Sequence, residues 1–203
     1  MSNSSQRKGY KYIRCNSIVN PLSNEYELST YEYYKLYAFF VTYSMCGRQS
    51  LRRRSILDYG WEKPTFKDSG LLGELEKVLR LNSNNNFSFC KNDSELYDAF
   101  KKCSLEDGEI VNVDIERAVI APTGGNNKYV KLFYRIRDGL AHGSFSLKIN
   151  SHGQKMIVLQ DQDGSNVTAR IVMRLDTLLC FVRIVDRNHL IVRANETEGM
   201  EVA

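Results

Sequence analysis

The chain has 203 residues and a mass of 23.4 kDa, which predicts one domain with or without a terminal arm. Hydrophobic residues make up 42% and charged residues 26%, a balance that supports a packed core and excludes a disordered, collagen-like or coiled-coil chain. The formal net charge of +4 is too small to indicate a nucleic-acid-binding protein by itself.

The apolar runs and the first residues argue against a membrane or secreted protein. The longest apolar runs, Tyr37–Val41 and Leu178–Val182, have five residues each, whereas a membrane-spanning helix needs about 20. The N-terminus is charged and lacks the apolar core of a secretory signal. We therefore expect a cytoplasmic protein that does not bind membranes.

The cysteines and histidines do not form a recognisable disulfide or metal-binding pattern. Five cysteines make an odd number and include no C-x-x-C pair, and the three histidines are widely separated. We expect most of the cysteines to be small buried hydrophobic residues. The sequence thus predicts neither a metal site nor a cofactor site.

The N-terminal segment, residues 1–28, has no periodic apolar pattern and is rich in Asn, Ser and Tyr. We interpret it as an N-terminal arm that can dock as a strand around Tyr10–Cys15. The first helix is predicted to begin after Ser29, because Ser29 and Glu32 fit a capping box and apolar residues follow at spacings of three and four. Gly47 can end this helix, or the helix can continue through Gln49–Leu57.

The middle of the chain predicts two shorter helices and one ambiguous segment. Ser69 can cap a helix over residues 70–81, and the apolar spacing predicts another helix over residues 93–103. Residues 107–120 mix the helical and the strand period. We favour a helix after Val111.

The next helix has the clearest pattern in the chain. Asn127 is a good N-cap, and Gly143 stands where a glycine would end a helix whose last residue is His142. The apolar residues between them recur at helical spacing: Tyr129, Leu132, Phe133, Ile136 and Leu140.

The segment after Gly143 predicts strands and a final helix. Alternation over residues 145–149 and a turn followed by residues 155–161 predict a β-hairpin. Residues 168–173 can add a third short strand, and the apolar spacing predicts a last helix over residues 175–187. Residues 191–203 form an acidic tail that we expect to be frayed.

Arg137 and His142 are the residues best suited to chemistry. They lie five residues apart at the end of the predicted helix, so the long guanidinium side chain can reach the imidazole. Imidazole gains and loses a proton near neutral pH, which suits proton transfer. A guanidinium binds phosphate through paired hydrogen bonds.

These residues resemble the HEPN superfamily of helical ribonucleases. Arg137, Asp138 and His142 match its R-[NDH]-x-x-x-H motif, including the polar residue directly after the arginine. Gly143, the predicted hairpin and the leucine-rich last helix follow in the order found in many HEPN proteins. The resemblance extends over residues 127–187.

The resemblance implies a mainly α-helical fold: a HEPN-type bundle over residues 29–190, with a small inserted β-hairpin or three-strand sheet before the last helix. It also implies a metal-independent endoribonuclease that cleaves RNA by 2′-OH attack in a homodimer. Arg137 and His142 would be catalytic, and Asp138 would support them. The family suggests a toxin–antitoxin or phage-defence setting, with an antitoxin or defence-system partner.

Two other interpretations of the motif stay open. His142 can simply cap the last helical turn, with Arg137 and Asp138 on a solvated face. The domain can also be a catalytically inactive HEPN module that binds a nucleotide or a partner protein. The basic residues Arg48 and Arg52–Arg54 can attract RNA or only solubilise a helix end.

Overall fold

The computed structural model describes residues 17–45, 54–78, 86–106, 108–110, 112–121, 127–164 and 166–191. The strand expected around Tyr10–Cys15 lies outside the described residues, as do Arg48 and residues 52–53 of the basic group. The acidic tail lies outside them from residue 192 onward.

Two of the helices begin at the caps expected from the sequence. α1 (Thr30–Leu36) starts after Ser29, and the capping box with Glu32 is formed. The helical path continues as a π-helical segment, η2 (Tyr37–Thr42), and ends before either of the two ends considered above. α4 (Lys128–Ala141) starts after Asn127, whose side chain accepts hydrogen bonds from two backbone amides of the first turn.

The other helices of the described residues are α2 (Leu71–Val78), α3 (Leu96–Lys102) and α5 (Leu175–Val185). α3 and α5 are shorter than the apolar spacing suggested, and the predicted end of the helix over residues 70–81 lies outside the described residues. Two 3₁₀ turns, η1 (Pro21–Ser23) and η3 (Asp93–Glu95), precede other elements. None of the helices in the described part of the chain is long and apolar enough to cross a lipid bilayer.

Among the described residues, five strands form one mixed sheet with the order β1-β2-β5-β4-β3. β1 is parallel to β2, and the other neighbours are antiparallel. The strands are β1 (Phe87–Phe89), β2 (Arg117–Ile120), β3 (Phe145–Ile149), β4 (Lys155–Asp163) and β5 (Asn166–Arg174).

The expectation of a mainly α-helical bundle with a small inserted hairpin is wrong, because this sheet makes the fold α/β. The hairpin and the third strand exist, but they join β2 and β1 rather than standing alone. β2 lies in the segment for which we favoured a helix. All four of its residues, Arg117 included, are buried, so the alternation that identifies a half-exposed strand is missing.

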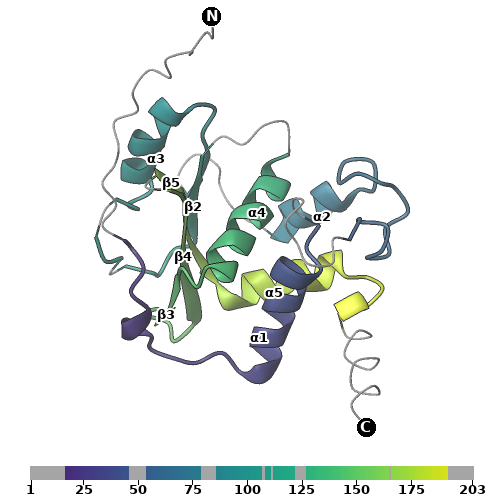
Figure 1. The fold of residues 1–203 in the computed structure, drawn as a ribbon, viewed down its shortest axis with the longest axis horizontal. Coiled ribbons are helices and arrows are strands. Elements are labelled where there is room, and N and C mark those ends of the chain that lie inside the picture. Colours follow the sequence, from purple (N-terminus) through teal and green to yellow (C-terminus); the bar gives the residue numbers. More distant parts are fainter. Residues whose placement is uncertain are drawn as a thin grey trace, which may run out of the picture.

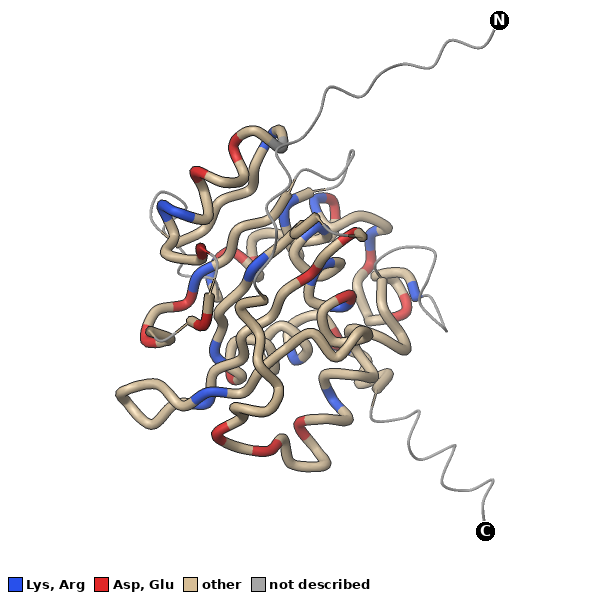
Figure 2. Tube along the Cα trace, turned by 60° about the vertical axis from the view of Figure 1, so that its left-hand side comes forward, with Lys and Arg blue, Asp and Glu red and all other residues tan. Residues whose placement is uncertain are grey.

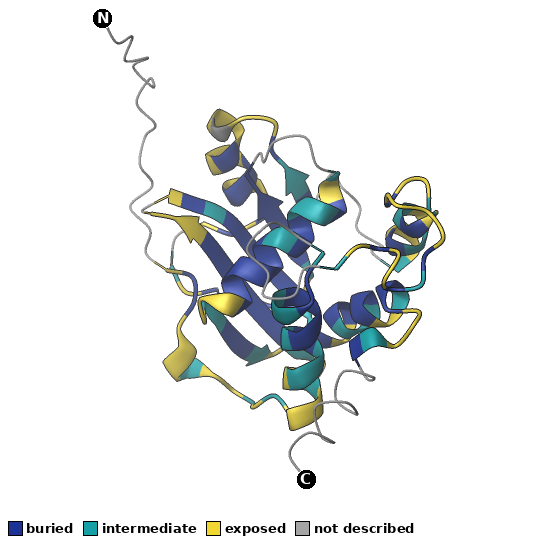
Figure 3. Ribbon diagram, turned by 45° about the vertical axis from the view of Figure 1, so that its right-hand side comes forward, coloured by how far each residue is buried: buried dark blue, intermediate teal, exposed yellow. Residues whose placement is uncertain are grey.

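The sheet is covered on both faces, which explains the continuous apolar runs in β4 and β5 (Figures 1 and 3). α4 and α5 pack on one face, where Ile157 and Leu159 contribute to the larger core cluster, and η2 and α2 pack against these two helices. α3 packs on the opposite face, where Met156 and Val158 belong to the second cluster together with Ile18. Side chains of successive strand residues point to opposite faces, so one strand supplies both cores.

The outer edge of β3 is closed by the segment that precedes α1. Asn24 Oδ1 accepts a hydrogen bond from Leu147 N at 2.8 Å, and Glu25 Oε2 accepts one from Ile149 N at 2.7 Å. The backbone of Glu25 donates to the carbonyl of Leu147 at 2.8 Å. These bonds satisfy an edge strand that could otherwise pair with another chain, and they hold residues 17–25 beside the sheet.

Candidate active site

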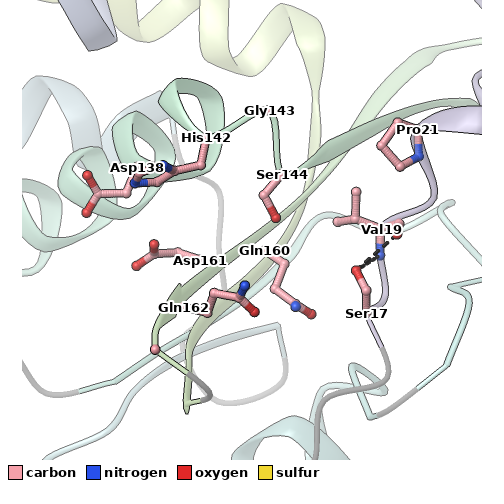
Figure 4. Close-up of a pocket in the computed structure, with 11 residues that line it drawn as sticks. Ser17, Val19, Pro21, Asp138, His142, Gly143, Ser144, Gln160, Asp161 and Gln162 are labelled. Atoms are coloured by element: carbon pink, nitrogen blue, oxygen red, sulfur yellow. Dashed lines mark hydrogen bonds between the residues drawn. The ribbon is translucent and has the colours of Figure 1, made fainter.

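A polar pocket of about 480 Å³ lies at the C-terminal end of α4. Figure 4 shows Asp138, His142 and Asp161 along one side of it, with Ser17, Val19 and Pro21 across from them. The lining residues come from the segment before α1, the end of α4 and the end of β4: Ser17, Val19, Pro21, Asp138, His142, Gly143, Ser144, Gln160, Asp161, Gln162 and Gly164.

The pocket forms where β4 continues beyond the end of β3. The pairing of β3 with β4 ends at Phe145 and Leu159, and Gln160 N donates once more to the carbonyl of Ser144 at 3.0 Å. From Asp161 onward β4 pairs only with β5, and a β-bulge follows between Asp161 and Gln162. The extra residue of the bulge is Thr168 on β5, and the stronger local twist that a bulge brings turns the end of β4, which forms one wall of the pocket.

The last turn of α4 forms the adjacent part of the same wall (Figure 4). Gly139 allows close approach of the helix to β4, since a Cβ at this position would lie 3.1 Å from a methyl group of Leu159. The helix ends at Ala141, one residue before the predicted end, and His142 is the C-cap residue. Gly143 follows with a φ of +63°, at the place predicted for a glycine that ends the helix. His142 is exposed and stands at the rim of the pocket.

Arg137 and Asp138 form a buried ion pair next to this rim. Nη1 of Arg137 donates to Oδ1 of Asp138, and both residues are less than one-tenth exposed. Burial raises the pKa of Asp138 above the ordinary carboxyl value. The bond to Arg137 opposes this rise, and the negative charge of Asp161 adds to it.

A second buried carboxylate, Asp161, lies on β4 in the same pocket. Its Oδ2 accepts hydrogen bonds from Nη1 of Arg135 at 2.7 Å and from Oγ1 of Thr168 at 2.6 Å. The two carboxylates and two guanidiniums balance in charge, which reduces the penalty for burying them. The exposed imidazole of His142 is therefore the group at the pocket that is best placed for proton exchange with a ligand.

The neighbouring Gln160 faces the other core and links the strand to two further segments. Its Oε1 accepts hydrogen bonds from Ile18 N at 3.3 Å and from Nε of Arg170 at 3.2 Å. Arg170 is almost completely buried, and its Nη1 donates to the carbonyl of Leu105 at 2.8 Å. These contacts attach the segment before α1 to the end of β4.

The structure brings two of the three predicted site residues to one pocket. Asp138 and His142 both line it, whereas Arg137 does not line it and contacts the carboxylate of Asp138. Sequence reasoning missed Arg135 and Asp161. A signal for Asp161 was present, since a carboxylate next to a run of buried strand residues needs a cation or several donors close by.

A second pocket of about 500 Å³ lies between α1 and α5 and is lined in part by Lys35, Arg183 and His189. It contains none of the motif residues. Within the described part of the chain, no group of three or more His, Cys, Asp or Glu residues is arranged to hold a metal ion. The pocket at the end of α4 is thus the stronger candidate for chemistry.

Comparison of the chain with models of protein families, with curated proteins and with solved structures finds no match. Function therefore has to be inferred from the geometry and chemistry of the pocket.

Proposed function

We propose that the chain is a metal-independent endoribonuclease in which His142 transfers a proton at the scissile phosphodiester. The observation that carries this proposal is the exposed position of His142 at the rim of a polar pocket that also contains Asp138. The same turn of α4 carries the resemblance to the HEPN ribonuclease motif. That resemblance suggests a role in a toxin–antitoxin or phage-defence system.

The chemistry follows from the groups at the rim. When a base removes the proton of a ribose 2′-hydroxyl, the oxygen attacks the adjacent phosphorus, and the 5′-oxygen leaves as an acid protonates it. The products are a 2′,3′-cyclic phosphate and a 5′-hydroxyl. Arg137 offsets the negative charge of Asp138 through the buried ion pair, which allows a phosphate to approach His142 at the pocket.

Acid and base roles at one phosphate are most easily divided between two imidazoles. Among the described residues one chain places one histidine, His142, at this pocket. We therefore expect a homodimer in which two copies of the α4 terminus meet at a composite site. Light scattering should give twice the 23.4 kDa mass of the chain, and a monomer alone at micromolar concentration would contradict the composite site.

Basic and acidic residues are intermixed along the described trace (Figure 2), so general electrostatic attraction contributes little to RNA binding. The composite site would instead bind phosphate through local groups. Binding is thus expected to depend on the residues at the end of α4 more than on the net charge of the chain.

The test is an RNA-cleavage assay with the full chain in excess EDTA, using cellular RNA and end-labelled synthetic RNA. We expect His142→Ala to lower the cleavage rate by about 10²- to 10⁴-fold, because it removes the proton-transfer group. His152→Ala is the matched control, since His152 is exposed in the turn between β3 and β4 and does not line the pocket. Its activity should equal that of the parent.

Two further variants separate the roles of the ion pair. Arg137→Ala should lose most of the activity, whereas Asp138→Asn should lose less, because the introduced amide oxygen can still accept a hydrogen bond from Arg137. Equal cleavage by the parent and His142→Ala would overturn the proposal. Absence of cleavage of any RNA would favour the inactive nucleotide- or protein-binding module instead.

A further inference from the structure

We infer that Asp161 is a specificity-determining residue of the proposed site and that its Oδ1 accepts a hydrogen bond from the bound nucleotide. The donor is a group on the base edge or the ribose 2′-hydroxyl. The inference rests on the proposed function for the identity of its ligand. It concerns a residue on β4, outside the segment that carries the R-[NDH]-x-x-x-H motif.

The two oxygens of Asp161 have different surroundings. Oδ2 accepts both the bond from Arg135 and the bond from Thr168. No donor among the described residues reaches Oδ1, although the residue is only 6% exposed. Oδ1 is not fully enclosed by protein atoms. Since Asp161 lines the pocket, a group in the pocket can reach this oxygen.

This arrangement holds an acceptor rigidly at the pocket wall. An ionised carboxylate only accepts hydrogen bonds, so a ligand group at Oδ1 has to be a donor. A phosphodiester has no donor for Oδ1, whereas the imidazole of His142 has an N–H donor, so the phosphate is placed toward His142 and the nucleoside toward Asp161. Arg135 and Thr168 fix the side chain from α4 and β5, and such a pre-positioned acceptor discriminates strongly between ligands with and without the donor.

Both possible donors belong to the same ligand class. Each RNA base carries N–H groups on its pairing edge, and each ribose carries a 2′-hydroxyl. The shared requirement is a neutral hydrogen-bond donor on the nucleoside.

Asp161→Asn tests this inference with little change in shape. Arg135 and Thr168 both donate, so they keep the oxygen of the introduced amide on their side. The amide nitrogen then takes the place of Oδ1, and the pocket presents a donor where it had an acceptor. Gln162→Ala is the control, because Gln162 is an exposed neighbour in the lining.

Binding is measured by fluorescence anisotropy in the full chain carrying His142→Ala, so that the probes stay intact. The probes are short labelled adenylate, cytidylate and uridylate oligonucleotides, each in ribo and 2′-deoxy form. We expect Asp161→Asn to weaken the affinity for the preferred probe by about ten- to a hundredfold, because a bond to a charged acceptor is lost. The affinity for probes without the donor should change by about twofold or less. Gln162→Ala should change the affinity for all probes by the same factor.

The pattern of loss identifies the donor. A reduced preference for ribo over 2′-deoxy probes assigns the 2′-hydroxyl, and a changed ranking of the bases assigns the base edge. An unchanged profile in Asp161→Asn overturns the inference, even if His142-dependent cleavage supports the ribonuclease. If Asp161→Asn does not fold, equal affinity of the His142→Ala chain for all probes overturns the inference as well.

The two proposals can also separate in the other direction. If the chain cleaves no RNA but Asp161→Asn loses nucleotide selectivity, the result supports Asp161 as the acceptor and contradicts the ribonuclease activity. Urea unfolding of each variant provides the check that the probes report on a folded pocket.

Discussion

Asp138 and Asp161 line one pocket but are stabilised in different ways. Asp138 contacts the adjacent Arg137 on its own helix, whereas Asp161 contacts Arg135 and Thr168 on two other elements. Breaking either pair by removing one partner would leave a buried charge without compensation, a change that typically costs about 3–5 kcal/mol. Conservative substitutions that keep one hydrogen bond are therefore the informative ones at this pocket.

The buried carboxyl of Asp138 predicts a pH-dependent stability. Because burial raises its pKa, Asp138 holds a proton in the folded chain at pH values where it is already ionised in the unfolded chain. Its contribution to the free energy of unfolding therefore falls as the pH rises from about 4, the unfolded carboxyl value, through the higher folded value. An asparagine side chain does not titrate, so the parent should lose stability relative to Asp138→Asn over this range.

Urea unfolding of the parent and of Asp138→Asn between about pH 4 and about pH 7 measures this difference. The raised pKa would be contradicted if the difference in free energy of unfolding between the two chains stayed constant with pH. It would also be contradicted if the parent gained stability relative to Asp138→Asn as the pH rises.

Gly143 predicts a loss of stability from backbone strain alone. Its φ of +63° is unfavourable for residues with a Cβ, and beyond its chain neighbours no atom of the described residues lies within 4 Å of where that Cβ would stand. Gly143→Ala should lower the free energy of unfolding by about 1 kcal/mol. Gly143→Asn should lose less, because Asn tolerates this conformation better. Equal stability of the parent and the alanine variant in urea would show that the turn relaxes.

At the scale of elements, α1 is connected to the sheet through its first turn. Oε2 of Glu32 accepts the backbone N–H of Ser29 at 2.8 Å, and Lys155 of β4 donates to both oxygens of Glu32 at 2.9 and 3.1 Å. The side chain of Ser29 accepts from Glu32 N at 3.3 Å and completes the capping box. One carboxylate thus serves the helix end and a contact between elements.

Ser29→Ala should lower the free energy of unfolding by about 1 kcal/mol, because the N-cap acceptor is lost. Ser29→Asp keeps an acceptor at the same position and should stay close to the parent in urea unfolding. If both variants lose the same free energy, the side chain of Ser29 does not act as a cap.

At the scale of the whole molecule, Phe133 of α4 joins segments that are far apart in the sequence. Its ring lies 5.6 Å from that of Phe40, 6.2 Å from that of Phe66 and 5.3 Å from that of Phe181, measured between ring centroids. Phe133 is thus the side chain at which three segments meet: η2, α5, and the loop that precedes α2. It lies on the helix that ends at the pocket.

Phe133→Ala should destabilise the fold by about 3–5 kcal/mol, since it leaves a cavity where these segments meet. Tyr97→Ala is the control, because Tyr97 is 58% exposed on α3 and its removal should change stability by less than about 0.5 kcal/mol. Chemical unfolding that gives similar values for the two variants would show that the aromatic cluster contributes little.

The sequence by itself determined the local features: the cap at Ser29, the helix from Asn127 to Gly143 and the strands that follow it. These features depend on residues close together in the chain, where helical spacing and turn residues are informative. His142 at the end of its helix belongs to this group, because the motif and the helix end are both set by residues close together in the chain.

Only the tertiary structure decided the fold class and the composition of the pocket. Strand pairing joins distant segments, and a strand buried on both faces, such as β2, has no period that separates it from a helix. The same holds for Asp161, which reaches the end of α4 through the register of β4 and a bulge. Its role follows from the residues that surround it, and these contacts are set by packing rather than by spacing along the chain.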